Sequence, residues 1–176
     1  MKSIDWSNVE EAKDFERLQP GGYIAKITSV EDLPDKEYLR MEYDIADGDF
    51  AGYYQDLYRN RGFWGGSFIR SYKEKALSFF KAFKTAVENS NPGYQFNNDE
   101  STLKGKLIGL VLGEEEYKAN DGSVKTRLYV DKTRSVKEIK SGNFEVPAKK
   151  LLPADQRPRA DFSAVDIDAS DDLPFA

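Results

Sequence analysis

Residues 103–130 read LKGKLIGLVLGEEEYKANDGSVKTRLYV, and they predict two antiparallel strands joined by a tight turn. Leu103–Leu112 carries apolar residues at both odd and even positions, which is typical of a strand buried on both faces. Asn120-Asp121-Gly122 favours a hairpin turn, because Asn and Gly tolerate the positive φ that such turns need. Val124–Val130 is then the return strand. Its inward side chains would be Leu128 and Val130, and its outward side chains Lys125, Arg127 and Tyr129.

Three more strands and two helices are expected ahead of this hairpin. Tyr38–Ile45 alternates apolar and polar residues, as a half-buried strand does. Tyr23–Val30 and Phe50–Tyr58 are the other two expected strands. The long helix is expected at Ser71–Asn89, where apolar residues recur at helical spacing. A short N-terminal helix is expected within residues 3–18.

Five strands with one α-helix between the third and the fourth form the layout of an OB-fold barrel. The expected fold class is therefore mainly β: a five-stranded OB-fold barrel with that helix, a short N-terminal helix and a disordered acidic C-terminal tail. A small α+β sandwich is the alternative. The expected domains are an N-terminal helical extension at residues 1–20, an OB-fold domain at 21–141, and a flexible linker with the acidic tail at 142–176.

The chain contains no Cys and no His, which removes several kinds of site. Disulfides, Cys/His zinc sites and catalysis by His are excluded. The stretch Asp44–Asp49 does not fit a calcium loop, because its third position is Ala46 and its sixth is Asp49 rather than Gly. The acidic run Glu114–Glu116 is a weak signal for a carboxylate-bound metal ion in a nuclease. We therefore expect no enzyme activity, no cofactor and no metal.

The N-terminal stretch MKSIDWSNVEEAKDF is polar and acidic and lacks the apolar segment of a signal peptide. No apolar run in the sequence reaches the length of a membrane span. A cytoplasmic protein without a membrane partner is expected.

Positive charge is concentrated in two regions, although the net charge is −5. Residues 59–84 carry seven bases and one acid, and residues 123–159 carry ten bases and four acids. Basic and aromatic residues are interleaved in two blocks, the first at residues 53–64 and the second at residues 117–134. This combination is typical of single-stranded nucleic-acid binding, because cations contact phosphates and rings stack on exposed bases. The alternative is that the aromatic rings belong to the core and that the Lys and Arg side chains are merely solvated. The candidate single-stranded DNA-binding residues are Tyr54, Tyr58, Arg59, Arg61, Phe63, Trp64, Tyr117, Lys118, Lys125, Arg127, Tyr129, Lys132 and Arg134.

The chain ends ASDDLPFA, residues 169–176, where two acids precede a short apolar cluster. This end resembles the acidic tip of the bacterial single-stranded DNA-binding proteins, which have an OB-fold, a disordered linker and a tip ending in Phe. The resemblance implies that the Phe enters an apolar pocket on replication and repair enzymes, while the acids meet basic residues at the rim. The matching residues are Asp171, Asp172, Leu173, Pro174 and Phe175. Ala176 departs from the pattern, because it displaces the terminal carboxylate by one residue.

The body also resembles phage-encoded replication-region proteins of Gram-positive hosts. The similar phrases are Trp64-Gly65-Gly66-Ser67, Ser71–Lys75, Asn91-Pro92-Gly93, Leu103–Lys106 and Gly113–Tyr117. Together, the residues and the resemblance predict non-catalytic, sequence-tolerant binding of single-stranded DNA in phage DNA replication or recombination, in the host cell cytoplasm. The tail would recruit replication or recombination proteins, and a homo-oligomer is left open. The alternative is a protein-binding adaptor of phage replication that does not bind DNA.

Overall fold

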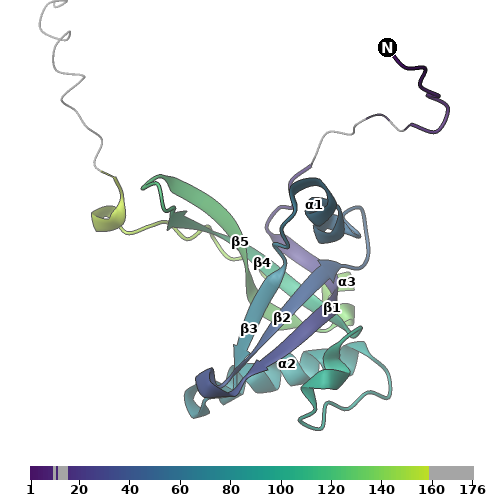
Figure 1. The fold of residues 1–176 in the computed structure, drawn as a ribbon. Coiled ribbons are helices and arrows are strands. Elements are labelled where there is room, and N and C mark those ends of the chain that lie inside the picture. Colours follow the sequence, from purple (N-terminus) through teal and green to yellow (C-terminus); the bar gives the residue numbers. More distant parts are fainter. Residues whose placement is uncertain (10, 12–15, 159–176) are drawn as a thin grey trace, which may run out of the picture.

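The computed structural model describes residues 1–9, 11 and 16–158, and their main feature is one five-stranded antiparallel sheet (Figure 1). The strands lie in the order β3-β2-β1-β4-β5. Their bounds are β1 Gly21–Leu33, β2 Tyr38–Ile45, β3 Ser67–Ser71, β4 Leu107–Lys118 and β5 Val124–Arg134. The α-helices of the described residues are α1 Tyr53–Arg61, α2 Leu77–Ser90 and α3 Val136–Lys140. Four short 3-10 turns lie at Pro34–Lys36, Glu74–Ala76, Glu100–Leu103 and Ala154–Gln156.

The core lies between one face of this sheet and α2, which crosses the lower end of the sheet (Figure 1). Alternation in β2 places Leu39, Met41 and Tyr43 in the core, as the sequence predicts. From α2, Phe83 and Val87 are fully buried against them. Each fully buried side chain of this size contributes roughly 1.5–3 kcal/mol to folding. Burial of Phe83 and Val87 therefore stabilises the packing of α2 on the sheet.

The expected strand Phe50–Tyr58 is wrong, because most of it forms helix α1. Gly52 ends the preceding turn with a φ of 79°, which a glycine adopts without strain. The Asp44 carboxylate then caps the helix from β2, since it accepts hydrogen bonds from the backbone N–H groups of Tyr54 (2.8 Å) and Gln55 (3.1 Å). Tyr54 and Leu57, three residues apart, form the buried side of α1.

The third strand is instead β3, which follows the glycine pair Gly65-Gly66. It pairs with β2 alone, and β5 pairs with β4 alone, so within the described residues these two strands are the free edges of the sheet. The mainly β class, the five antiparallel strands and the helix between the third and fourth strands are confirmed. The sheet is not closed by hydrogen bonds into a barrel.

The two ends of the chain differ from the expected pattern where they are described. Residues 1–9, 11 and 16–18 contain no helix, and the rest of the expected N-terminal helix lies outside the described residues. The expected flexible linker begins at residue 142, yet the following segment lies along β4. Lys150 donates its N–H to Glu114 (2.9 Å) and accepts from the N–H of Glu116 (2.8 Å). The segment after residue 142 is therefore hydrogen-bonded to β4 at Lys150, and the predicted acidic tip, residues 171–175, lies outside the described residues.

None of the helices in the described part of the chain has the length and apolar character that a membrane crossing requires.

Candidate nucleic-acid interface

A groove of about 660 Å³ lies between the two free edges of the sheet, with α1 and the loop after it along its side. β3 contributes Ser67–Arg70, and β5 contributes Thr126–Val130. Edge strands carry backbone N–H and C=O groups that no neighbouring strand pairs. The groove therefore offers polar backbone groups from two sides in addition to its side chains.

Arg70 is the most informative side chain in this groove. Its guanidinium lies 5.1 Å from the centroid of the Phe68 ring, on the core-facing side of β3, and donates to the backbone oxygen of Ile69 (2.9 Å). Arg70 is half-buried, and this partial desolvation lowers its pKa to about 10, so the side chain still carries its charge at neutral pH. Within the described residues it makes no ion pair with a carboxylate. A desolvated cation without a counter-ion is unfavourable until an anion binds beside it.

Two more arginines make the groove basic. Arg17 lies at its wall, and Arg127 projects from β5. Among the described residues that line the groove, Glu115 is the acidic one, and its carboxylate already pairs with the Nε atom of Arg127 (2.9 Å). The local charge of the groove thus favours an anionic ligand, although the whole chain is acidic.

The first sequence block places two exposed rings close to this basic groove. Phe63 lines it with 53% of its surface exposed, and Tyr58 on α1 is 51% exposed. Trp64 is half-buried, donates its Nε1–H to the oxygen of Gly66 (3.0 Å), and has its ring centroid 6.4 Å from that of Tyr58. Phe63 and Tyr58 therefore present the ring faces that bases could stack on.

Tyr54 belongs to the core, as the alternative interpretation of the rings allows. It is 5% exposed, and its ring packs edge-on against Tyr43 with centroids 5.4 Å apart. Burial raises the pKa of the Tyr54 hydroxyl to about 12. Tyr54 lines the groove from below but has no free ring face for stacking. Two basic residues of the block, Arg59 and Arg61, lie exposed at the end of α1, where Arg59 forms a loose ion pair with Asp56 (3.7 Å).

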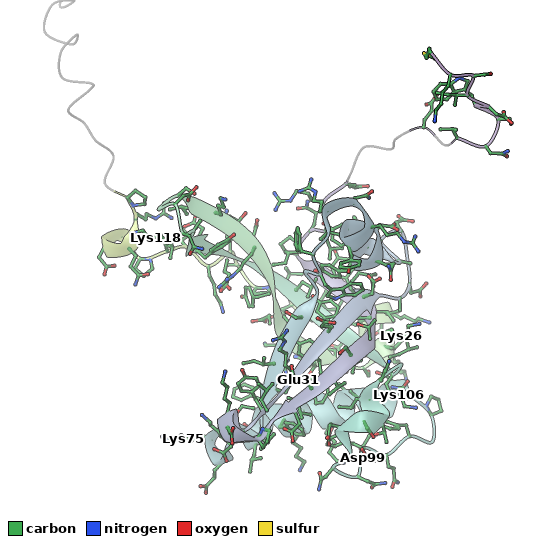
Figure 2. The ribbon with its side chains drawn as sticks, viewed as in Figure 1. Lys26, Glu31, Lys75, Asp99, Lys106 and Lys118 are labelled. Atoms are coloured by element: carbon green, nitrogen blue, oxygen red, sulfur yellow. The ribbon has the colours of Figure 1, made fainter. Side chains whose placement is uncertain are left out.

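The second block follows the β4–β5 hairpin, whose outer half projects from the sheet as an arm (Figure 1). Lys118 lies near the end of this arm opposite Val124 (Figure 2), and Lys125 lies opposite Tyr117 on the neighbouring strand. The Arg127 guanidinium covers the ring of Tyr117, with 4.7 Å to the centroid. The arm therefore adds exposed lysines beyond the groove, while its aromatic ring is already covered.

Leu128 and Val130 of β5 pack on the core, as predicted. The alternating residues Lys125, Arg127 and Tyr129 therefore lie on the outer face of the strand. Tyr129 is nevertheless not available for stacking. The Nζ atom of Lys150 lies 4.2 Å from its ring centroid, and its hydroxyl is buried without a hydrogen-bond partner. Lys132 is exposed and Arg134 half-buried, both towards the C-terminal end of β5 and outside the groove.

The structure thus brings together Tyr54, Phe63, Arg127 and Tyr129 from the two blocks, and it adds two arginines that the sequence interpretation missed. Arg17 carries no local signal. Arg70 lies two residues after the buried Phe68, so a strand assigned to Ser67–Ser71 would have placed it on the core-facing side.

No protein-family model matches this chain, and no curated protein matches it either. The chemistry of the groove is therefore the guide to the function of this protein.

Proposed function

We propose that this protein binds single-stranded DNA without sequence preference, in the groove between β3 and β5. The observation that carries the proposal is the half-buried guanidinium of Arg70, which has no carboxylate partner among the described residues and lies in a groove that contains two further arginines. A phosphate group would supply the missing counter-ion, and backbone N–H groups of the strand edges could donate to its oxygens.

The rings beside the groove favour single strands over duplex. Phe63 and Tyr58 are about half exposed, and a flat ring can stack only on a base that is not already stacked in a helix. Stacking on a ring tolerates any base, because every base has a π face. Cations in the groove and rings at its side match the two parts of a single-strand site.

The arrangement of the sheet supports a partly open OB-fold as the architecture of this site. Five strands form one antiparallel sheet with α2 between β3 and β4, and the two edge strands line the same groove. OB-folds are partly open five-stranded barrels that bind oligonucleotides on the sheet and at the hairpin loops. On this proposal the β4–β5 arm, with Lys118 and Lys125, extends the path of the DNA backbone beyond the groove.

The wider role in phage DNA replication or recombination rests on the resemblance of the sequence. On that proposal the protein coats exposed strands and acts without catalysis, and residues 171–175 recruit replication or recombination proteins. An acidic, partly apolar segment suits such recruitment, because its carboxylates and apolar side chains complement a basic, apolar pocket.

Phe63→Ala tests whether the exposed ring takes part in binding. Loss of one base–ring stack of about 1–3 kcal/mol should weaken oligo-dT binding roughly 5- to 150-fold. The measurement is a titration of fluorescently labelled oligo-dT, followed by anisotropy. Phe79→Ala is the matched control, because Phe79 is 70% exposed on α2 and lies outside the groove. Equal affinity of the Phe63→Ala variant and the unmodified protein would remove Phe63 from the proposed site.

A further inference from the structure

A second pocket, of about 350 Å³, lies at the N-terminal end of α2 and shares no residue with the basic groove. It is formed where the end of β1, the start of β2, the start of α2 and the segment from Phe96 to Glu100 meet. Its size falls within the range of sites that take a small ligand or a large side chain.

The walls of this pocket are apolar. Leu39 and Phe96 are buried beneath it, and the Phe80 ring lies with its centroid 5.9 Å from that of Phe96 and 6.4 Å from that of Tyr72. Leu77 stands at the opening with 49% of its surface exposed. Apolar surface left open to water in a concave site gains free energy when an apolar group covers it.

The rim of the pocket is acidic. Asp32 and Glu100 line it, no cation does so among the described residues, and neither carboxylate forms an ion pair within them. The Tyr72 hydroxyl donates to the Oδ1 atom of Asp32 (2.9 Å). Desolvation, this hydrogen bond and the negative charges of Asp32, Glu37 and Glu100 raise the pKa of Tyr72. Three carboxylates therefore act on one point of the pocket wall.

We propose that this pocket is a docking site for a partner protein, which inserts an apolar side chain flanked by Lys or Arg. The apolar walls would take the inserted side chain, and the carboxylates at the rim would pair with the flanking cations. Charge complementarity favours this occupant, because the rim of the pocket is acidic and the flanking residues of the partner are cationic. Residues 160–176 of the chain carry five acids and no base, so its own C-terminal segment has the wrong sign. Nucleic acid has the wrong sign as well, and the pocket is therefore separate from the proposed DNA site.

The test is an NMR titration of the full, ¹⁵N-labelled chain, without DNA, with two capped tripeptides. One has the sequence Lys-Phe-Lys and the other Glu-Phe-Glu. The cationic peptide should cause saturable shifts at the amides of Tyr72, Leu77 and Glu100, and it should bind at least tenfold more tightly than the acidic peptide. Comparable affinity of the two peptides, shifts confined to other surfaces, or no saturable shift at millimolar peptide would overturn the proposal.

Two variants and a control identify the contributions of the rim and the opening. The double substitution Asp32→Asn with Glu100→Gln keeps side-chain shape and removes two charges, and it should weaken the cationic peptide tenfold. Leu77→Ser should weaken both peptides. Phe79→Ser is the control, because Phe79 is the more exposed neighbour on α2 but does not line the pocket. An equal loss in Phe79→Ser and Leu77→Ser would contradict the assignment, since it would reflect a general effect on the helix.

Discussion

Arg70→Met is expected to weaken single-stranded DNA binding by roughly 10- to 100-fold, the range set by losing one charge-assisted hydrogen bond to phosphate. The same change should leave the free energy of unfolding unchanged or raise it. Arg70 is a half-buried cation without a carboxylate partner in the described residues. Replacing a buried charge by an apolar side chain of similar volume is often neutral or stabilising.

A loss of affinity without a loss of stability distinguishes a binding residue from a structural one. Affinity is measured by anisotropy with labelled oligo-dT, and stability by urea denaturation. Lys26→Met is the matched control, because Lys26 is an exposed cation on β1 outside the groove and lies on the far side of the molecule from the β4–β5 arm (Figure 2). A parallel fall in affinity and stability in Arg70→Met would mean that Arg70 supports the fold rather than the ligand. An affinity loss in Lys26→Met as large as that in Arg70→Met would also contradict the proposal, since the lower net positive charge would then explain both losses.

Asp44→Ala should lower the free energy of unfolding by about 3 kcal/mol, which is the largest stability effect expected from a single polar side chain here. The Asp44 carboxylate is 9% exposed and accepts three backbone hydrogen bonds, from Ile45 (2.8 Å), Tyr54 (2.8 Å) and Gln55 (3.1 Å). Its removal leaves N–H groups at the start of α1 without an acceptor. It also removes a negative charge from the positive end of the helix dipole.

Urea denaturation measures this loss, and amide hydrogen exchange at Tyr54 and Gln55 locates it in α1. Asp44→Asn keeps one acceptor oxygen and should cost about half as much. Asp47→Ala is the control, because the exposed Asp47 accepts a single local hydrogen bond from Gly48 (2.9 Å). A cost of less than about 1 kcal/mol for Asp44→Ala, similar to a surface substitution, would show that the helix does not depend on this cap. Since α1 carries Tyr58, Asp44→Ala should also weaken oligo-dT binding, which Arg70→Met does without loss of stability.

Most of the sheet was predictable because its strands carry their own patterns. The alternation in Tyr38–Ile45 gave the observed bounds of β2, and the parity of Leu128 and Val130 gave the core side of β5. The error at Phe50–Tyr58 has a tertiary cause. Its aromatic residues suit a strand, but Gly52 and a carboxylate ten residues before Tyr54 supply the turn and the cap that start a helix.

The candidate site was predictable as a composition but not as a geometry. The combination of basic and aromatic residues indicated the two blocks. These blocks included the exposed Phe63 and the groove residue Arg127. The pattern could not distinguish the exposed Phe63 from the buried Tyr54, because both are aromatic residues close to Arg or Lys in the sequence. It also assigned Tyr129 to the ligand, whereas Lys150, from a segment expected to be flexible, covers its ring.

The main proposal is tested most directly by fluorescence anisotropy with labelled oligo-dT and with a duplex of equal length, at low and at moderate salt. Preferential binding of the single strand is expected, and the logarithm of its affinity should fall linearly with the logarithm of salt concentration as phosphate counter-ions are released. No binding of oligo-dT at low salt would contradict the proposal and would favour a protein-binding adaptor. Equal binding of the duplex would contradict the role assigned to Phe63 and Tyr58.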